Sequence, residues 1–77
     1  MSDENEVMST GDRLIYMANQ IARNLAAEGE AEAVAATARH IASFWDPRMR
    51  ARIAGLIVEK PAAFSPIAAA AVRRITP

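Results

Sequence analysis

Residues 37–60 read TARHIASFWDPRMRARIAGLIVEK and predict two helices with a sharp break between them. Asp46 can accept a hydrogen bond from a first-turn N–H of a following helix. Pro47 suits the first helical position, where its missing N–H has no intrahelical partner. Apolar residues recur at helical spacing on both sides of this pair. We therefore predict one helix that ends near Phe44 and another that runs to about Glu59.

The same type of break predicts the remaining helices. Ser65 followed by Pro66 indicates a last helix, and Pro61 ends the helix before it. Gly29 separates a first helix, capped by Ser9 or Thr10, from the helix that leads to the central break. The residues expected to face inward are Leu14, Met17, Ala18, Ile21 and Leu25; Val34, Thr37, Ala38, Ile41 and Phe44 or Trp45; Met49, Ile53, Leu56 and Ile57; and Ile67, Ala71, Val72 and Ile75.

The composition favours helices throughout. The chain of 77 residues is 52% hydrophobic but only 5% aromatic, because alanine supplies much of the apolar content. Alanine is the strongest helix former, and no stretch shows strand alternation. We predict an all-α fold, a small single domain of about four short helices in which a helical hairpin is covered by two shorter helices. The domain spans residues 11–77, after a flexible acidic tail over residues 1–10.

Charge and cysteine content bear on the environment and partners. Residues 1–38 carry seven acidic and two basic side chains, and residues 39–77 carry two acidic and seven basic ones. Such asymmetry can orient docking, although solvated helix faces are the commoner explanation. The acidic start is unlike a signal peptide, and no apolar run approaches the roughly 20 residues that span a bilayer. We therefore expect a soluble, cytoplasmic protein, and the absence of cysteine is compatible with a reducing cytoplasm.

The sequence offers little for catalysis. The carboxylates at residues 28–32 surround a glycine in what reads as an exposed turn, where nothing would raise a pKa for acid catalysis. His40 is the single histidine, and no cysteine accompanies it as a metal ligand. The three glycines are too far apart for a phosphate-binding loop. We therefore expect no enzyme activity, no bound cofactor or metal, and no small-molecule substrate.

The segment FWDPRMRAR, residues 44–52, combines two aromatic residues with three arginines. Phe44 and Trp45 either close the small core or anchor a partner, since aromatic residues and arginine are enriched at binding hot spots. Arg48 and Arg52 share one helix face. A basic helix after a tight turn also fits an alternative function, an independent regulatory or nucleic-acid-binding module. Zero net charge and an acidic tail argue against nucleic acid.

Two stretches, MANQIA at residues 17–22 and HIASFWDPRMR at residues 40–50, resemble the signatures of the delta subunit of NAD-dependent formate dehydrogenases. The closing pattern, with Phe64-Ser65-Pro66 followed by Ala71 and Ile75, is also similar. The resemblance spans about Met17 to Ile75. It implies that the signature residues contact a partner or support the scaffold, and we take as candidate interface residues Asn19, Gln20, His40, Phe44, Trp45, Asp46, Arg48, Met49 and Arg50.

The resemblance implies a non-catalytic accessory subunit that supports assembly, stability or cofactor loading of the enzyme. Its partners would be the large catalytic subunit and the other subunits, with neither nucleic acid nor a membrane involved. That complex is expected to carry a molybdenum or tungsten bis-pterin cofactor, iron–sulfur clusters, FMN and NAD. As a hypothesis, the basic C-terminal half, led by Arg48 and Arg50, docks on an acidic or carbonyl-lined surface of the large subunit. Trp45 or Met49 fills a hydrophobic pocket there.

Overall fold

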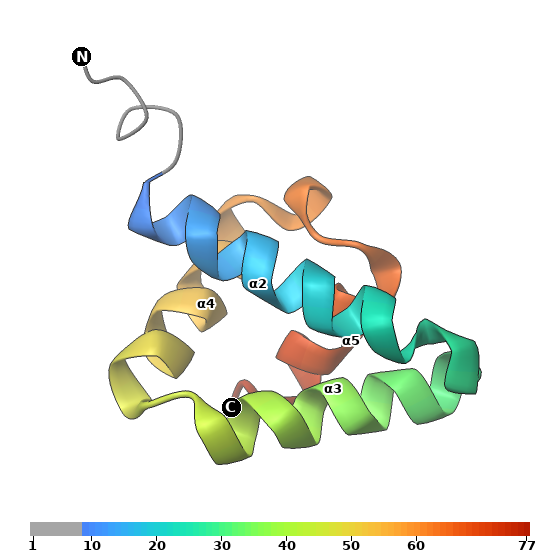
Figure 1. The fold of residues 1–77 in the computed structure, drawn as a ribbon. Helices are drawn as coiled ribbons and strands as arrows, with labels where there is room; N and C mark the ends of the chain where they lie inside the picture. The colour runs from blue at the N-terminus through green and yellow to red at the C-terminus, as the bar shows by residue number, and fades with distance from the viewer. Residues whose placement is uncertain (1–8) are drawn as a thin grey trace.

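The computed structural model describes residues 9–77, which form four α-helices and two short 3-10 turns (Figure 1). In chain order these are α2 (Thr10–Leu25), η1 (Ala26–Glu28), α3 (Glu30–Phe44), α4 (Pro47–Glu59), η2 (Pro61–Ala63) and α5 (Pro66–Ile75). No strand occurs in this part of the chain, so the all-α prediction is confirmed. The predicted tail lies outside the described residues, except that Ser9 caps α2 and Thr10 begins it.

Side-chain caps begin three of the helices, as the sequence predicted. The Asp12 N–H donates to Ser9 Oγ at 3.1 Å, and the Ser9 N–H donates back to the Asp12 carboxylate at 3.4 Å. Asp46 Oδ1 accepts from the Met49 N–H at 2.9 Å, and Ser65 caps α5 in the same way at 3.2 Å. Each cap satisfies a first-turn N–H that has no partner within its helix.

A glycine makes the tight connection between α2 and α3 possible. Gly29 has φ +99° and ψ 148°, a backbone conformation that residues with a Cβ rarely adopt. The chain reverses there, so α3 returns alongside α2 as the second arm of a hairpin (Figure 1). The predicted helical hairpin is therefore present, and its boundary falls at the predicted residue.

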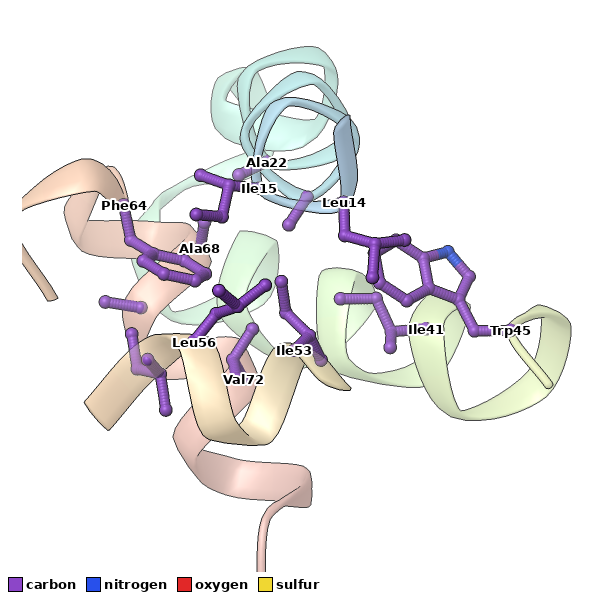
Figure 2. Close-up of a cluster of buried hydrophobic side chains, with 13 residues drawn as sticks. Leu14, Ile15, Ala22, Ile41, Trp45, Ile53, Leu56, Phe64, Ala68 and Val72 are labelled. Carbon is purple, nitrogen blue, oxygen red and sulfur yellow. The ribbon is translucent and has the colours of Figure 1, made fainter. Parts of the chain in front are cut away.

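The two shorter helices α4 and α5 cover the hairpin and enclose the core. All four helices contribute to one large apolar cluster (Figure 2). Its buried members are Leu14, Ile15, Ala18, Ala22, Ile41, Trp45, Ile53, Leu56, Ile57, Phe64, Ala68, Ala69 and Val72. Burial of this apolar surface is the main force that holds such short helices together.

Small side chains dominate the contact between α3 and α5. Val34 and Ala38 of α3 meet Ala71 of α5 in a second, smaller cluster. Ala38 is 4% exposed and Ala71 is fully buried, so the two helix backbones approach closely there. Thr37 is also fully buried, and its Oγ1 has no hydrogen-bond partner among the described residues.

Trp45 belongs to the core and Phe44 does not, which decides between the alternatives left open by the sequence. Trp45 is 4% exposed, whereas Phe44 is 76% exposed. The reason is local: α3 ends at Phe44, and Trp45 adopts an extended backbone with φ −87° and ψ 140°. This turn directs the indole back toward Leu14 and Ile41 (Figure 2).

Met17 corrects the predicted core. Its 40% exposure shows that it lies at the flank of the buried stripe of α2. The stripe is centred on Leu14, Ile15, Ala18 and Ala22. At 100° per residue, Met17 points well to one side of that centre, although its spacing from Leu14 fits a helix.

Candidate interaction surface

An exposed aromatic pair marks the outer side of α3. The rings of His40 and Phe44 have centroids 4.8 Å apart and an interplanar angle of 43°. Residues four apart on a helix are neighbours, so this contact follows directly from the spacing. Both side chains are exposed, and the phenyl ring of Phe44 has no place in the core clusters. A large apolar ring held in this position is suited to contact another molecule.

The pair borders a shallow groove where α2 and α3 pack together. We call this the α2–α3 groove. It has a volume of about 320 Å³ and is lined by Leu25, Ala36, Arg39, His40, Ser43 and Phe44. Leu25 is its lining residue on α2, whereas Ile21, one turn earlier, is half-buried against the core. Ala36, His40 and Phe44 follow one another at four-residue spacing and form a row on α3.

Positive charge accompanies this groove. Arg39 lines it and is 3.8 Å from the Glu32 carboxylate in an exposed ion pair, the type that contributes little to stability. The Arg50 guanidinium donates a hydrogen bond to the carbonyl of Trp45, at the end of α3. A cation in that position also suits the helix dipole. The C-terminal end of the aromatic row is therefore next to a guanidinium.

The other arginines of the FWDPRMRAR segment lie on α4. Arg48 is exposed in the first turn. Arg52 Nη1 is 3.9 Å from the Glu59 carboxylate, also in an exposed pair. Of these three arginines, Arg50 alone is partly buried. Its hydrogen bond to the Trp45 carbonyl gives it a structural role at the end of α3.

Asn19 joins two distant parts of the chain. Its Nδ2 donates to the Ala63 carbonyl at 3.1 Å, and its Oδ1 accepts from the Ser65 N–H at 2.9 Å. The amide therefore fixes the turn between η2 and α5 against α2. This use of Asn19 is structural, and no local sequence pattern signals it.

Gln20 faces a second, larger depression between α2 and the start of α5. Its volume is about 780 Å³, and its lining includes Tyr16, Arg23, Glu30 and Pro66. Its lining thus includes one basic side chain, Arg23, and one acidic side chain, Glu30. Two further lining residues, Asn19 and Ser65, are already hydrogen-bonded to each other.

The candidate residues therefore divide by their surroundings. Trp45 is buried, Asp46 caps α4, and Met49 is half-buried against the core. His40 and Phe44 remain together on the surface. Leu25, Ala36, Arg39 and Ser43 complete their groove. The sequence analysis expected Leu25 to face inward, but it is only half-buried and lies outside the core clusters, and the other three residues were not selected. The helical spacing of Ala36, His40 and Phe44 was the available signal for part of this row.

The described residues contain no group of three or more histidine, aspartate or glutamate side chains placed to hold a metal ion. The pKa of Asp12 is lowered from 3.8, first by the hydrogen bond from the Ser9 backbone and then by the charge of Lys60. This carboxylate caps α2 and lies outside both depressions.

Comparison with known families assigns the chain to one of them. A family described as the NADH-dependent formate dehydrogenase delta subunit, FdsD, matches residues 13–72. The chain belongs to this family. The match runs from the first turn of α2 to Val72 in α5, so the whole α2–α3 groove lies within the FdsD span.

Searches of curated proteins and of solved structures returned no significant match. The FdsD assignment therefore comes from the family comparison, and it agrees with the resemblance found in residues 17–22 and 40–50. Over residues 9–77, none of the helices combines the length and apolar content that crossing a membrane requires.

Proposed function

We propose that this chain is a non-catalytic accessory subunit of a multi-subunit NAD-dependent formate dehydrogenase. It docks on the large catalytic subunit and supports assembly, stability or cofactor loading of the complex. The family match over residues 13–72 carries this proposal. The exposed pair of His40 and Phe44 within that span supports a function in binding.

Docking would act through mass action. A partner that binds the native fold stabilises it in proportion to the logarithm of the ratio of its concentration to Kd. A domain of 77 residues has a small core, so this contribution is large relative to its own stability. In the same way, a bound delta chain would stabilise whichever conformation of the large subunit it prefers.

The redox groups are expected in the other subunits. These would be a molybdenum or tungsten bis-pterin cofactor, iron–sulfur clusters, FMN and NAD. This chain has no cysteine, the usual ligand of iron–sulfur clusters. We propose that the chain acts on these groups only through the fold of the subunit that binds them, in a cytoplasmic complex.

Affinity purification of the tagged chain from its native cells tests the proposal. Mass spectrometry identifies the retained chains, and metal analysis measures molybdenum, tungsten and iron. Recovery of the dehydrogenase subunits in fixed ratio with these metals is the expected result for a permanent subunit. Recovery of a metal-poor large subunit alone indicates a maturation factor. If no dehydrogenase chain is retained at low salt, the proposed function is wrong.

A further inference from the structure

We infer that the α2–α3 groove is the docking face, and that its occupant is an acidic amphipathic helix of the large subunit. This inference rests on the proposed function and deepens it, because it names the surface and the chemistry of the bound segment. Three observations carry it: an apolar row that stays exposed, positive charge along that row, and the different character of the other surfaces.

The apolar row is the first observation. Phe44 is 76% exposed and its ring contacts the tilted ring of His40, and the groove beside them is closed on the α2 side by Leu25. A row of side chains with four-residue spacing along such a groove can accept one face of a helix, with apolar side chains as anchors.

The charge of the groove is the second observation. Among its lining residues Arg39 is the only one with a permanent charge, and no carboxylate lines it. Arg39 is held only by an exposed contact of 3.8 Å to Glu32, so its guanidinium is available to a better-placed carboxylate. Arg50 adds a second cation at the end of α3. A segment that offers apolar side chains flanked by carboxylates therefore complements the groove.

The other exposed apolar side chains lie in different settings. Val58 is 78% exposed on α4, but it lines neither depression. Tyr16 is 55% exposed in the larger depression, where Arg23 and Glu30 present opposite charges. Neither Val58 nor Tyr16 therefore combines an exposed aromatic ring with neighbouring charges that are all of one sign. Val58 therefore serves as a control that matches Phe44 in exposure, and Tyr16 as a control that matches it in size.

The decisive experiment compares recovery of the large subunit by tagged variants, co-expressed with the complete dehydrogenase. Phe44→Ala and Arg39→Glu are the test variants. Val58→Ala, Tyr16→Ala and Arg73→Glu are the controls, since Arg73 is an exposed arginine on α5. We expect at least about a tenfold loss of recovery for Phe44→Ala, as for a central aromatic anchor, and a change below about twofold for the controls. Thermal unfolding of each isolated variant verifies that the fold is intact.

The outcomes separate the two proposals. If the unmodified chain retains no large subunit, the proposed function fails. If it retains the large subunit and Phe44→Ala does so equally well, the function stands and the docking face is wrong. A loss caused by Tyr16→Ala but not by Phe44→Ala places docking at the depression between α2 and α5, and also overturns the inference.

Crosslinking identifies the occupant. Phe44→p-benzoylphenylalanine in the complex is expected to crosslink, on irradiation, to a large-subunit peptide that has apolar residues at helical spacing and carboxylates beside them. The same photoreactive residue at Val58 is the control. A crosslink to a second copy of this chain, or to a basic peptide, contradicts the inference. Sedimentation of the isolated chain tests self-association independently, and a dimer that Phe44→Ala dissociates also contradicts it.

Discussion

Asn19 and Ser65 are joined across 46 residues by a side chain that hydrogen-bonds the backbone. The Asn19 Oδ1 accepts from the Ser65 N–H at 2.9 Å, while its Nδ2 donates to the carbonyl of Ala63 at 3.1 Å. One side-chain amide thus hydrogen-bonds both a backbone carbonyl and a backbone N–H of the turn that leads into α5. The position of the last helix depends on this contact as well as on apolar packing.

Asn19→Ala is expected to lower the free energy of unfolding by about 1–3 kcal/mol, because two backbone groups lose their partner at a partly buried turn. Urea denaturation measures the change. Asn24→Ala is the matched control, since Asn24 is exposed on the same helix, and its effect should stay within about 0.5 kcal/mol. Equal midpoints for the two variants would show that the amide contact is unimportant.

Two adjacent aromatic residues should differ strongly in their response to truncation. Trp45→Ala removes a core side chain that is 4% exposed, at a cost of about 3–5 kcal/mol. A chain of 77 residues is expected to have a total stability of only about 4–12 kcal/mol. Phe44→Ala should change stability by less than about 0.5 kcal/mol. Thermal melts followed by circular dichroism test both, and a severe effect of Phe44→Ala would contradict the placement of its ring.

Two glycines should respond to alanine with opposite signs. Gly29 has φ +99°, so Gly29→Ala is expected to destabilise the fold by about 1–3 kcal/mol through backbone strain. In Gly55, inside α4, a Cβ would meet only a Glu59 carboxylate oxygen at 4.0 Å. Gly55→Ala should therefore stabilise by about 0.5–1 kcal/mol. Urea midpoints that move in the same direction would refute the assignment of strain to Gly29.

Two threonines test the effect of a hydroxyl with and without a hydrogen-bond partner. Thr37 is fully buried and its Oγ1 has no partner among the described residues, so Thr37→Val is expected to stabilise by about 1 kcal/mol. The Thr76 Oγ1 donates to the Val72 carbonyl at 2.7 Å, so Thr76→Val should destabilise by about 1 kcal/mol. Calorimetric unfolding distinguishes the two signs. Destabilisation by Thr37→Val would indicate that its hydroxyl has a partner.

Acid should weaken the start of α2. Because the pKa of Asp12 is lowered in the folded state, its contribution to stability is present above the unfolded value of 3.8. That contribution is lost as the pH falls through the lower, folded pKa. Asp12→Asn should therefore be less stable than the parent chain at neutral pH and approach it well below pH 3.8. A difference in melting temperature that is independent of pH would contradict this linkage.

Lys60→Met provides the matching measurement for the same carboxylate. Lys60 Nζ is 3.5 Å from Asp12 Oδ1, so its removal should raise the pKa of Asp12 part of the way toward the ordinary value. The hydrogen bond from the Ser9 backbone, which is the larger cause, remains. An NMR titration of the Asp12 carboxyl measures the shift, and added salt should reduce the effect of Lys60 in the parent chain.

The sequence was sufficient to place the helices because their ends are local events. A capping side chain, a proline at the first position and a glycine at a reversal act over three or four residues, so Asp46, Ser65 and Gly29 could be identified without the fold. The all-α class followed from the same signals together with the alanine content.

The roles of individual residues required the fold. Phe44 and Trp45 are adjacent at a helix end, where the 3.6-residue period stops, so periodicity could not decide which ring is buried. Asn19 finds its partners 44 and 46 residues away, beyond any local pattern. The groove joins Leu25 to Ala36 and Phe44 only because α2 and α3 lie side by side.

The alanine contact between α3 and α5 restricts how related chains can diverge. Ala38 and Ala71 have almost no exposed surface, so a larger residue at either position would push the two helices apart. Substitutions should therefore accumulate on the outer faces, while the separation of these two helices stays nearly constant through evolution. A descendant that acquires a new binding partner would do so by exchanging surface side chains over an unchanged backbone.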